Sequence, residues 1–156
     1  MKSFILLLLL FTIGSRAQVS GFVVSDNMLI WENIFITSES NIPALIGRHP
    51  RLEVISSANN IYKGKGVLVK NTCPGTSSFM DNEFSFDFEI ETGEGKYRVT
   101  VANIVYHKNK RNIGAEKYFL TKGAVKAGKS NQKDLECLET YLNRLFTNTM
   151  LYKNRM

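Results

Sequence analysis

The chain has 156 residues, of which 44% are hydrophobic and 22% charged, and its formal net charge is +6. This length fits one compact domain with its own core. Two cysteines do not make a disulfide scaffold, and beyond its first residues the chain has no apolar run long enough to span a membrane.

The first residues have the pattern of a secretory signal peptide. Lys2 gives a positive start, residues 4–11 are an unbroken apolar run, and Ser15 and Ala17 are the small residues expected before a cut after Ala17. The run is shorter than the roughly 20 residues that a membrane span requires. We therefore expect residues 1–17 to be removed. Residues 18–156 would form a single α+β domain in the periplasm or outside the cell.

An oxidising compartment permits a disulfide between the two cysteines, Cys73 and Cys137. The sequence leaves this bond open, because the separation of the two Cα atoms decides whether it forms. A mature chain of this size can bury a core without it.

Apolar and β-branched runs between turn residues predict the first strands. They cover residues 21–24, 28–36, 52–57 and 61–70, and an Asn-rich turn joins the last two. Between the second and third strands, Ser38 is a candidate N-cap for a short helix that runs to about Arg48. Its buried face would hold three apolar residues, Ile42, Leu45 and Ile46.

The clearest hairpin covers residues 84–101. Its two strands alternate apolar and polar residues, as half-buried strands do. A four-residue loop over 92–95 would place Glu91 opposite Lys96 and Glu89 opposite Arg98. The same register would place Ile90 opposite Tyr97, Phe88 opposite Val99 and Phe86 opposite Val101, so charge pairing and apolar pairing agree on it.

A C-terminal helix is predicted over residues 131–151, with Ser130 or Asn131 as N-cap. Its apolar stripe consists of Leu135, Leu138, Leu142, Leu145 and Phe146. The order is then strand, helix, four antiparallel strands and helix. This order predicts an α+β fold with one sheet and helices packed on one of its faces.

Three segments carry a resemblance to a known family: residues 28–35 (MLIWENIF), 62–66 (YKGKG) and above all 95–104 (GKYRVTVANI). Together with the leader, they resemble a domain-of-unknown-function family from exported proteins of Bacteroidetes-type bacteria, which has a TBP-like fold. The resemblance covers about residues 21–107 and the C-terminal helix by position. It implies the TBP-like fold and no activity, because a fold does not define a function.

Residues 123–130 (GAVKAGKS) fit the G-x-x-x-x-G-K-[ST] pattern of a phosphate-binding loop from Gly123 to Ser130. The context argues against that function. The preceding sheet is predicted to be antiparallel, and after Ser130 there is little more than one helix, so no later strand can provide a Mg²⁺-side aspartate. An enzyme or a phosphate or nucleotide binder that uses this segment is therefore the alternative to a non-catalytic binding domain.

Charge is unevenly distributed in the second half of the chain. Residues 81–94 are acidic, whereas residues 108–129 are predicted to be a basic flexible loop leading into the last helix. A candidate anion-binding set consists of Lys108, Lys110, Arg111, Lys117, Lys122, Lys126, Lys129 and Lys133. A merely solvated loop explains the same pattern equally well.

No catalytic or metal-binding constellation emerges from the sequence. His49 and His107 have no carboxylate or thiol at ligand spacing, and no nucleophile elbow is present. We expect a non-catalytic, cofactor-free binding domain of the bacterial envelope. Its partner would be an envelope protein or an anionic surface component rather than nucleic acid, because the basic segment holds few aromatic residues.

Overall fold

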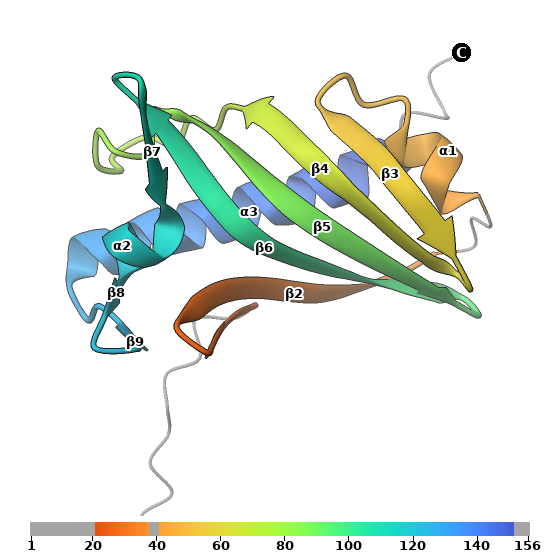
Figure 1. The fold of residues 1–156 in the computed structure, drawn as a ribbon, viewed down its shortest axis with the longest axis horizontal. Coiled ribbons are helices and arrows are strands. Elements are labelled where there is room, and N and C mark those ends of the chain that lie inside the picture. The colour runs from red at the N-terminus through yellow and green to blue at the C-terminus, as the bar shows by residue number, and fades with distance from the viewer. Residues whose placement is uncertain (1–20, 38–40, 152–156) are drawn as a thin grey trace, which may run out of the picture.

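The computed structural model describes residues 21–37 and 41–151, without the side chains of 148–151. The expected signal peptide over 1–17 and the candidate N-cap Ser38 lie outside the described residues. One large antiparallel sheet forms the centre of the molecule, and the long helix α3 runs behind it (Figure 1).

The sheet has seven strands in the order β1-β2-β6-β5-β4-β3, and β7 also pairs with β6. The strands are β1 (Phe22–Ser25), β2 (Met28–Ile36), β3 (Leu52–Ala58), β4 (Ile61–Val69), β5 (Glu83–Gly93), β6 (Lys96–Lys108) and β7 (Arg111–Gly114). A small second sheet pairs β8 (Leu120–Thr121) with β9 (Ala124–Val125). The helices are α1 (Ile42–Ile46), α2 (Ala115–Phe119) and α3 (Lys129–Leu151).

Four of the hairpins close through two-residue turns in which both residues have positive φ. These turns are Asp26-Asn27, Asn59-Asn60, Asn109-Lys110 and Lys122-Gly123. Turns of this kind match the right-handed twist of the flanking strands, and Asn, Asp and Gly tolerate them best. Local sequence therefore determines where the chain reverses.

The predicted register of the β5–β6 hairpin is wrong by two residues. The turn consists of Glu94 and Gly95 alone, with Gly95 at φ +66°, and Glu91 lies opposite Arg98. Ile90 consequently pairs with Val99 rather than with Tyr97. A shift of two positions keeps every side chain on its face, so the alternation that predicted the strands could not distinguish the two registers.

The core lies between the sheet and the helices. Strands β5 and β6 contribute the alternating apolar residues, and all five residues of the predicted α3 stripe are buried. The ring of Trp31 on β2 is fully buried and stacks on Phe146 of α3, with centroids 6.0 Å apart. The α+β arrangement with helices on one face of one sheet is confirmed.

Two local predictions need correction. The first helix is shorter than expected and begins after Asn41, whose Oδ1 accepts a hydrogen bond from the Ala44 backbone N–H at 3.2 Å, since Pro43 fits only the first turn. Residues 108–129 are not a loop, because they form β7, α2, β8 and β9. Ala115 and Phe119 are fully buried there, so two apolar anchors organise a segment whose composition is dominated by lysine.

Candidate functional site

The face of the sheet that points away from α3 has no covering layer among the described residues. Strand alternation places on it Ile34 and Ile36 of β2, Ile55 of β3 and Val67 of β4. Their exposed fractions are 57%, 82%, 58% and 41%. We call this surface the open face. Exposed β-branched side chains on one face of a sheet are typical of a contact surface.

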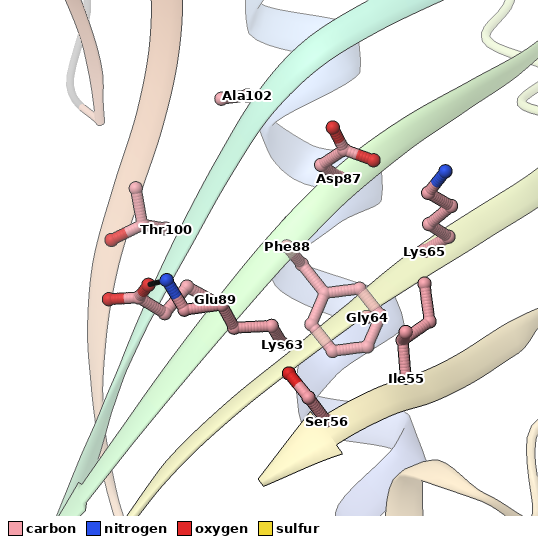
Figure 2. Close-up of a pocket in the computed structure, with 10 residues that line it drawn as sticks. All are labelled: Ile55, Ser56, Lys63, Gly64, Lys65, Asp87, Phe88, Glu89, Thr100 and Ala102. Atoms are coloured by element: carbon pink, nitrogen blue, oxygen red, sulfur yellow. Dashed lines mark ion pairs between the residues drawn. The ribbon is translucent and has the colours of Figure 1, made fainter. Parts of the chain in front are cut away.

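A depression of about 490 Å³ lies on the open face across β3, β4, β5 and β6 (Figure 2). Small residues on β6, Thr100 and Ala102, form one side of it, and Ile55 and Ser56 of β3 lie at the other. Between them, Lys63 of β4 and Glu89 of β5 form an ion pair of 3.0 Å.

A bulge in the sheet borders this depression. Ser85 lies opposite Val105, but Asp87 lies opposite Ala102, so β6 has one extra residue here. Asn103 has φ +53°, and its side chain donates a hydrogen bond of 2.8 Å to Asp87. Bulges bend strands and redirect side chains, which explains a hollow at this point of the sheet.

The open face is more acidic than basic. Arg98 pairs with Glu91 and, at 3.9 Å, with Glu32, and Lys65 lies opposite Glu53. By strand alternation, the carboxylates of Glu32, Glu53, Glu83, Asp87, Glu89 and Glu91 on this face outnumber the cations of Lys63, Lys65, Lys96 and Arg98. Such a surface disfavours phosphate backbones, which require a cationic footprint.

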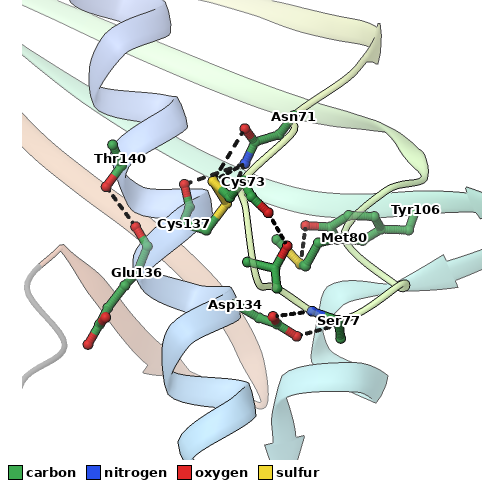
Figure 3. Close-up of a disulfide and its surroundings, with 10 residues drawn as sticks. Asn71, Cys73, Ser77, Met80, Tyr106, Asp134, Glu136, Cys137 and Thr140 are labelled. Atoms are coloured by element: carbon green, nitrogen blue, oxygen red, sulfur yellow. Dashed lines mark hydrogen bonds between the residues drawn. A yellow bond between two sulfur atoms is a disulfide. The ribbon is translucent and has the colours of Figure 1, made fainter.

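The loop between β4 and β5 is fastened to α3 by a disulfide (Figure 3). Cys73 and Cys137 are bonded, with their Cα atoms 6.1 Å apart and 64 positions apart in sequence. The Asn71 side chain donates to the Cys137 backbone oxygen at 3.4 Å. Sequence alone left this pairing open, and the fold brings the two residues to bonding distance.

A second fastening of the same loop is a buried aspartate on α3. The Asp134 carboxylate is fully buried and accepts hydrogen bonds from the Ser77 backbone N–H (2.9 Å) and hydroxyl (2.5 Å) and from the Tyr118 hydroxyl (2.6 Å). Burial, together with this hydrogen bond to Asp134, raises the pKa of Tyr118, so the phenol remains a donor.

Sequence reasoning did not find this cluster, although a signal was present. Asp134 precedes Leu138 by four positions and therefore falls on the apolar stripe of the helix. A carboxylate at a core position requires buried donors. The donors, Ser77 and Tyr118, come from distant segments that the sequence does not connect.

The eight predicted basic residues gather at one end of the molecule. They lie at the end of β6 and in the β6–β7 turn, in β7 and α2, around the β8–β9 hairpin and in the first turns of α3. Figure 1 shows these elements along the same end of the molecule, with the β6–β7 turn and the β8–β9 hairpin at its opposite edges. Of the candidate anion-binding set, Lys108 and Lys117 line one common recess. Within the described part of the chain, none of these side chains forms an ion pair.

The segment from Gly123 to Ser130 does not have the geometry of a phosphate-binding loop. Gly123 is in the turn between β8 and β9, and the next two residues pair with β8. The Lys126 backbone N–H donates to the Phe119 oxygen at 2.9 Å. A phosphate-binding loop needs such N–H groups free and pointing inward. Here the segment is instead paired within the β8–β9 hairpin, and the Lys126 N–H directly after it is already hydrogen-bonded.

The histidines are engaged in local contacts. His107 contacts the Ser85 hydroxyl through Nε2 and the Asn112 side chain through Nδ1, both at 2.9 Å. His49 Nδ1 accepts from the Arg51 backbone N–H at 3.2 Å, and burial lowers the pKa of its ring. In the described ranges, no group of three or more His, Cys, Asp or Glu residues is placed to hold a metal ion.

The architecture is that of the TBP-like α+β proteins, a single curved antiparallel sheet with helices on one face. It resembles the crystal structure of a TBP-like protein from Parabacteroides distasonis, with a TM-score of 0.56 and 13% identity over 82% of this chain and 94% of that one. It also resembles a DUF4468 family protein from Bacteroides ovatus, with a TM-score of 0.52 and 14% identity over 84% of this chain and 91% of that one.

Both similarities agree with the TBP-like, Bacteroidetes-type family that the strand motifs indicated, and at this identity they establish the fold alone. No protein-family model matches the sequence, and no curated protein sequence does so. Of the helices among the described residues, none is long and apolar enough to cross a membrane.

Proposed function

We propose that this chain is an exported, non-catalytic binding domain of the bacterial envelope, and that it binds a protein partner through the open face of its sheet. The uncovered face is the observation that carries the proposal. It combines exposed isoleucines, a depression of about 490 Å³ and charged side chains on a rigid strand scaffold. Protein–protein interfaces have this mixture of apolar and polar area.

The charge of the open face indicates the chemistry of the partner. Because carboxylates are in excess around the depression, we expect a partner with a basic or neutral contact surface and an apolar centre. Ile55 of β3 and Thr100 of β6 lie on opposite sides of the depression, so the contact surface of the partner would extend across the strands between them. Nucleic acid does not fit such a surface.

The proposal of export rests on the leader over residues 1–17. The Cys73–Cys137 disulfide suits an oxidising compartment. N-terminal sequencing of the protein from the periplasm or medium of a Bacteroides host should begin near Gln18. Recovery of the chain in the cytoplasm with residues 4–11 intact would contradict export.

Photo-crosslinking tests the binding surface. A photoreactive residue at Thr100 or Ala102 should yield one discrete adduct in the native envelope, because both positions border the depression. The matched control is Thr140, which is exposed on the opposite, helical side of the domain. Adducts of equal yield from Thr140, or adducts from Thr140 alone, would contradict the open face as the binding surface.

A further inference from the structure

A recess of about 450 Å³ lies at the basic end of the molecule, and it shares no lining residue with the depression on the open face. It is lined by Ser77, Ser78, Phe79, Lys108, Ile113, Lys117 and Tyr118. We propose that this recess binds a phosphate group, with the Lys108 and Lys117 ammonium groups and the Ser78 hydroxyl as donors. The proposal is independent of the function assigned to the open face.

The walls of the recess are fixed before any ligand arrives. Asp134 holds Ser77 and Tyr118, and the disulfide at Cys73 holds the start of the same loop. The Tyr118 ring stacks on Phe79, with centroids 3.8 Å apart and planes 12° apart. A site that is already ordered loses little conformational entropy on binding.

The three donors have no competing partner in the part of the chain that the structure describes. Lys108 and Lys117 form no ion pair there, whereas the ion pairs that are present all lie on the open face. Among the described residues, no hydrogen bond engages the Ser78 hydroxyl, although the Ser78 backbone oxygen accepts one from the Asn82 side chain. An unpaired ammonium group beside a free hydroxyl is a donor set suited to phosphate oxygens.

The surroundings of the recess are positive despite the buried aspartate. The hydroxyls of Ser77 and Tyr118 point their protons at Asp134, so the carboxylate is satisfied from within. Lys126 lies over the Tyr118 ring, 5.8 Å from its centroid, and contacts the Tyr118 backbone oxygen. Lys133 lies against Gly75 of the same loop. Lysines of β6 and α2 thus line the recess, and Lys126 and Lys133 contact the segments that form its walls, which favours an anion.

Nucleic acid is a weaker match than an isolated phosphate group. The recess presents one half-buried ring, Tyr118, whereas single-strand binding uses successive aromatic platforms along a cationic groove. Two sources of the phosphate remain chemically equivalent, a soluble phosphate compound and a lipid headgroup. The experiment separates them.

The test uses the chain from Gln18 to its C-terminus. Pyrophosphate is titrated calorimetrically, and vesicles of phosphatidylcholine with or without phosphatidylglycerol are used in a sedimentation assay. The recess variant is Lys108→Gln/Lys117→Gln, and the matched control is Lys122→Gln/Lys129→Gln, which removes equal charge from the same end. We expect saturable binding of one probe, weakened about tenfold by the recess variant and less than about threefold by the control.

Ser78→Ala should also weaken that binding without any change of charge, and circular dichroism verifies that each variant is folded. Binding of pyrophosphate would identify a soluble ligand, and binding only of vesicles with phosphatidylglycerol would identify a lipid headgroup. Equal weakening by the two double variants would show a diffuse positive field and overturn the site. Absence of saturable binding to either probe would overturn it as well.

Discussion

Two glycines of β4 lie beneath the rings of two β5 phenylalanines, and this packing can be tested quantitatively. Gly66 pairs with Phe86, and a Cβ built at Gly66 would be 2.3 Å from the Phe86 Cζ atom. Gly64 pairs with Phe88, but a Cβ there would meet both the Phe88 ring at 2.3 Å and the Glu53 backbone oxygen at 2.2 Å. At Gly66 only a side chain obstructs the new methyl group, whereas at Gly64 a backbone oxygen obstructs it as well.

Gly66→Ala should therefore lower the free energy of unfolding by about 1–3 kcal/mol, because overpacking forces the ring from its place. Phe86→Ala, at 2% exposure, should cost about 3–5 kcal/mol. The double variant should cost no more than Phe86→Ala alone, because the new methyl group occupies space that the ring has left. For Gly64→Ala, removal of Phe88 should not restore stability, because the backbone of β3 still obstructs the methyl group.

The assay is urea unfolding at equilibrium, followed by the fluorescence of Trp31, the one tryptophan, which is fully buried. The four single variants and two double variants form two mutant cycles. If the losses in free energy of unfolding of Gly66→Ala and Phe86→Ala add up in the double variant, the Phe86 ring does not pack on Gly66. A loss below about 0.5 kcal/mol for Gly66→Ala would refute this packing as well.

Three further changes test other features. Gly95→Ala should cost about 1–2 kcal/mol because Gly95 has φ +66° with nothing within 4 Å, whereas the control Gly93→Ala meets only ordinary contacts and should cost little in the same urea assay. Cys73→Ala/Cys137→Ala should lower the urea midpoint by the equivalent of up to about 4 kcal/mol, since the bond closes a loop of 64 positions, and an unchanged midpoint would contradict this. The neutral His49 ring accepts the Arg51 N–H and its pKa lies below 6.5, so its contribution to stability is complete above pH 6.5 and decreases as the pH falls toward the lowered folded-state pKa. His49→Gln should accordingly flatten the acid limb of stability against pH, and an unaltered slope would exclude this origin.

The open face and the basic end show how much of a binding site can be predicted from the sequence. Alternation on β5 already indicated that Asp87 and Glu89 point to solvent, but no sequence pattern indicated a hollow beside them. The hollow depends on the bulge at Asn103 and on small residues of β6, whose neighbours are set by strand order. The basic residues were visible as a composition, whereas the recess between Lys108 and Lys117 required the loop from residue 71 to 82 to be placed beside them.

The sequence by itself determined the features that depend on near neighbours in the chain. The period of two in residues 84–101 and the stripe from Leu135 to Phe146 determined which side chains are buried, and the Asn- and Gly-containing pairs determined most turns. These signals are local because backbone geometry repeats over a few residues.

Only the tertiary structure decided the register of β5 with β6, the Cys73–Cys137 bond, the donors of Asp134 and the elements within residues 108–129. A register shift of two residues leaves the alternation unchanged, and the bond and the hydrogen bonds join segments distant in sequence. Strand order and helix placement set those distances, and they follow from packing of the whole core rather than from any local pattern.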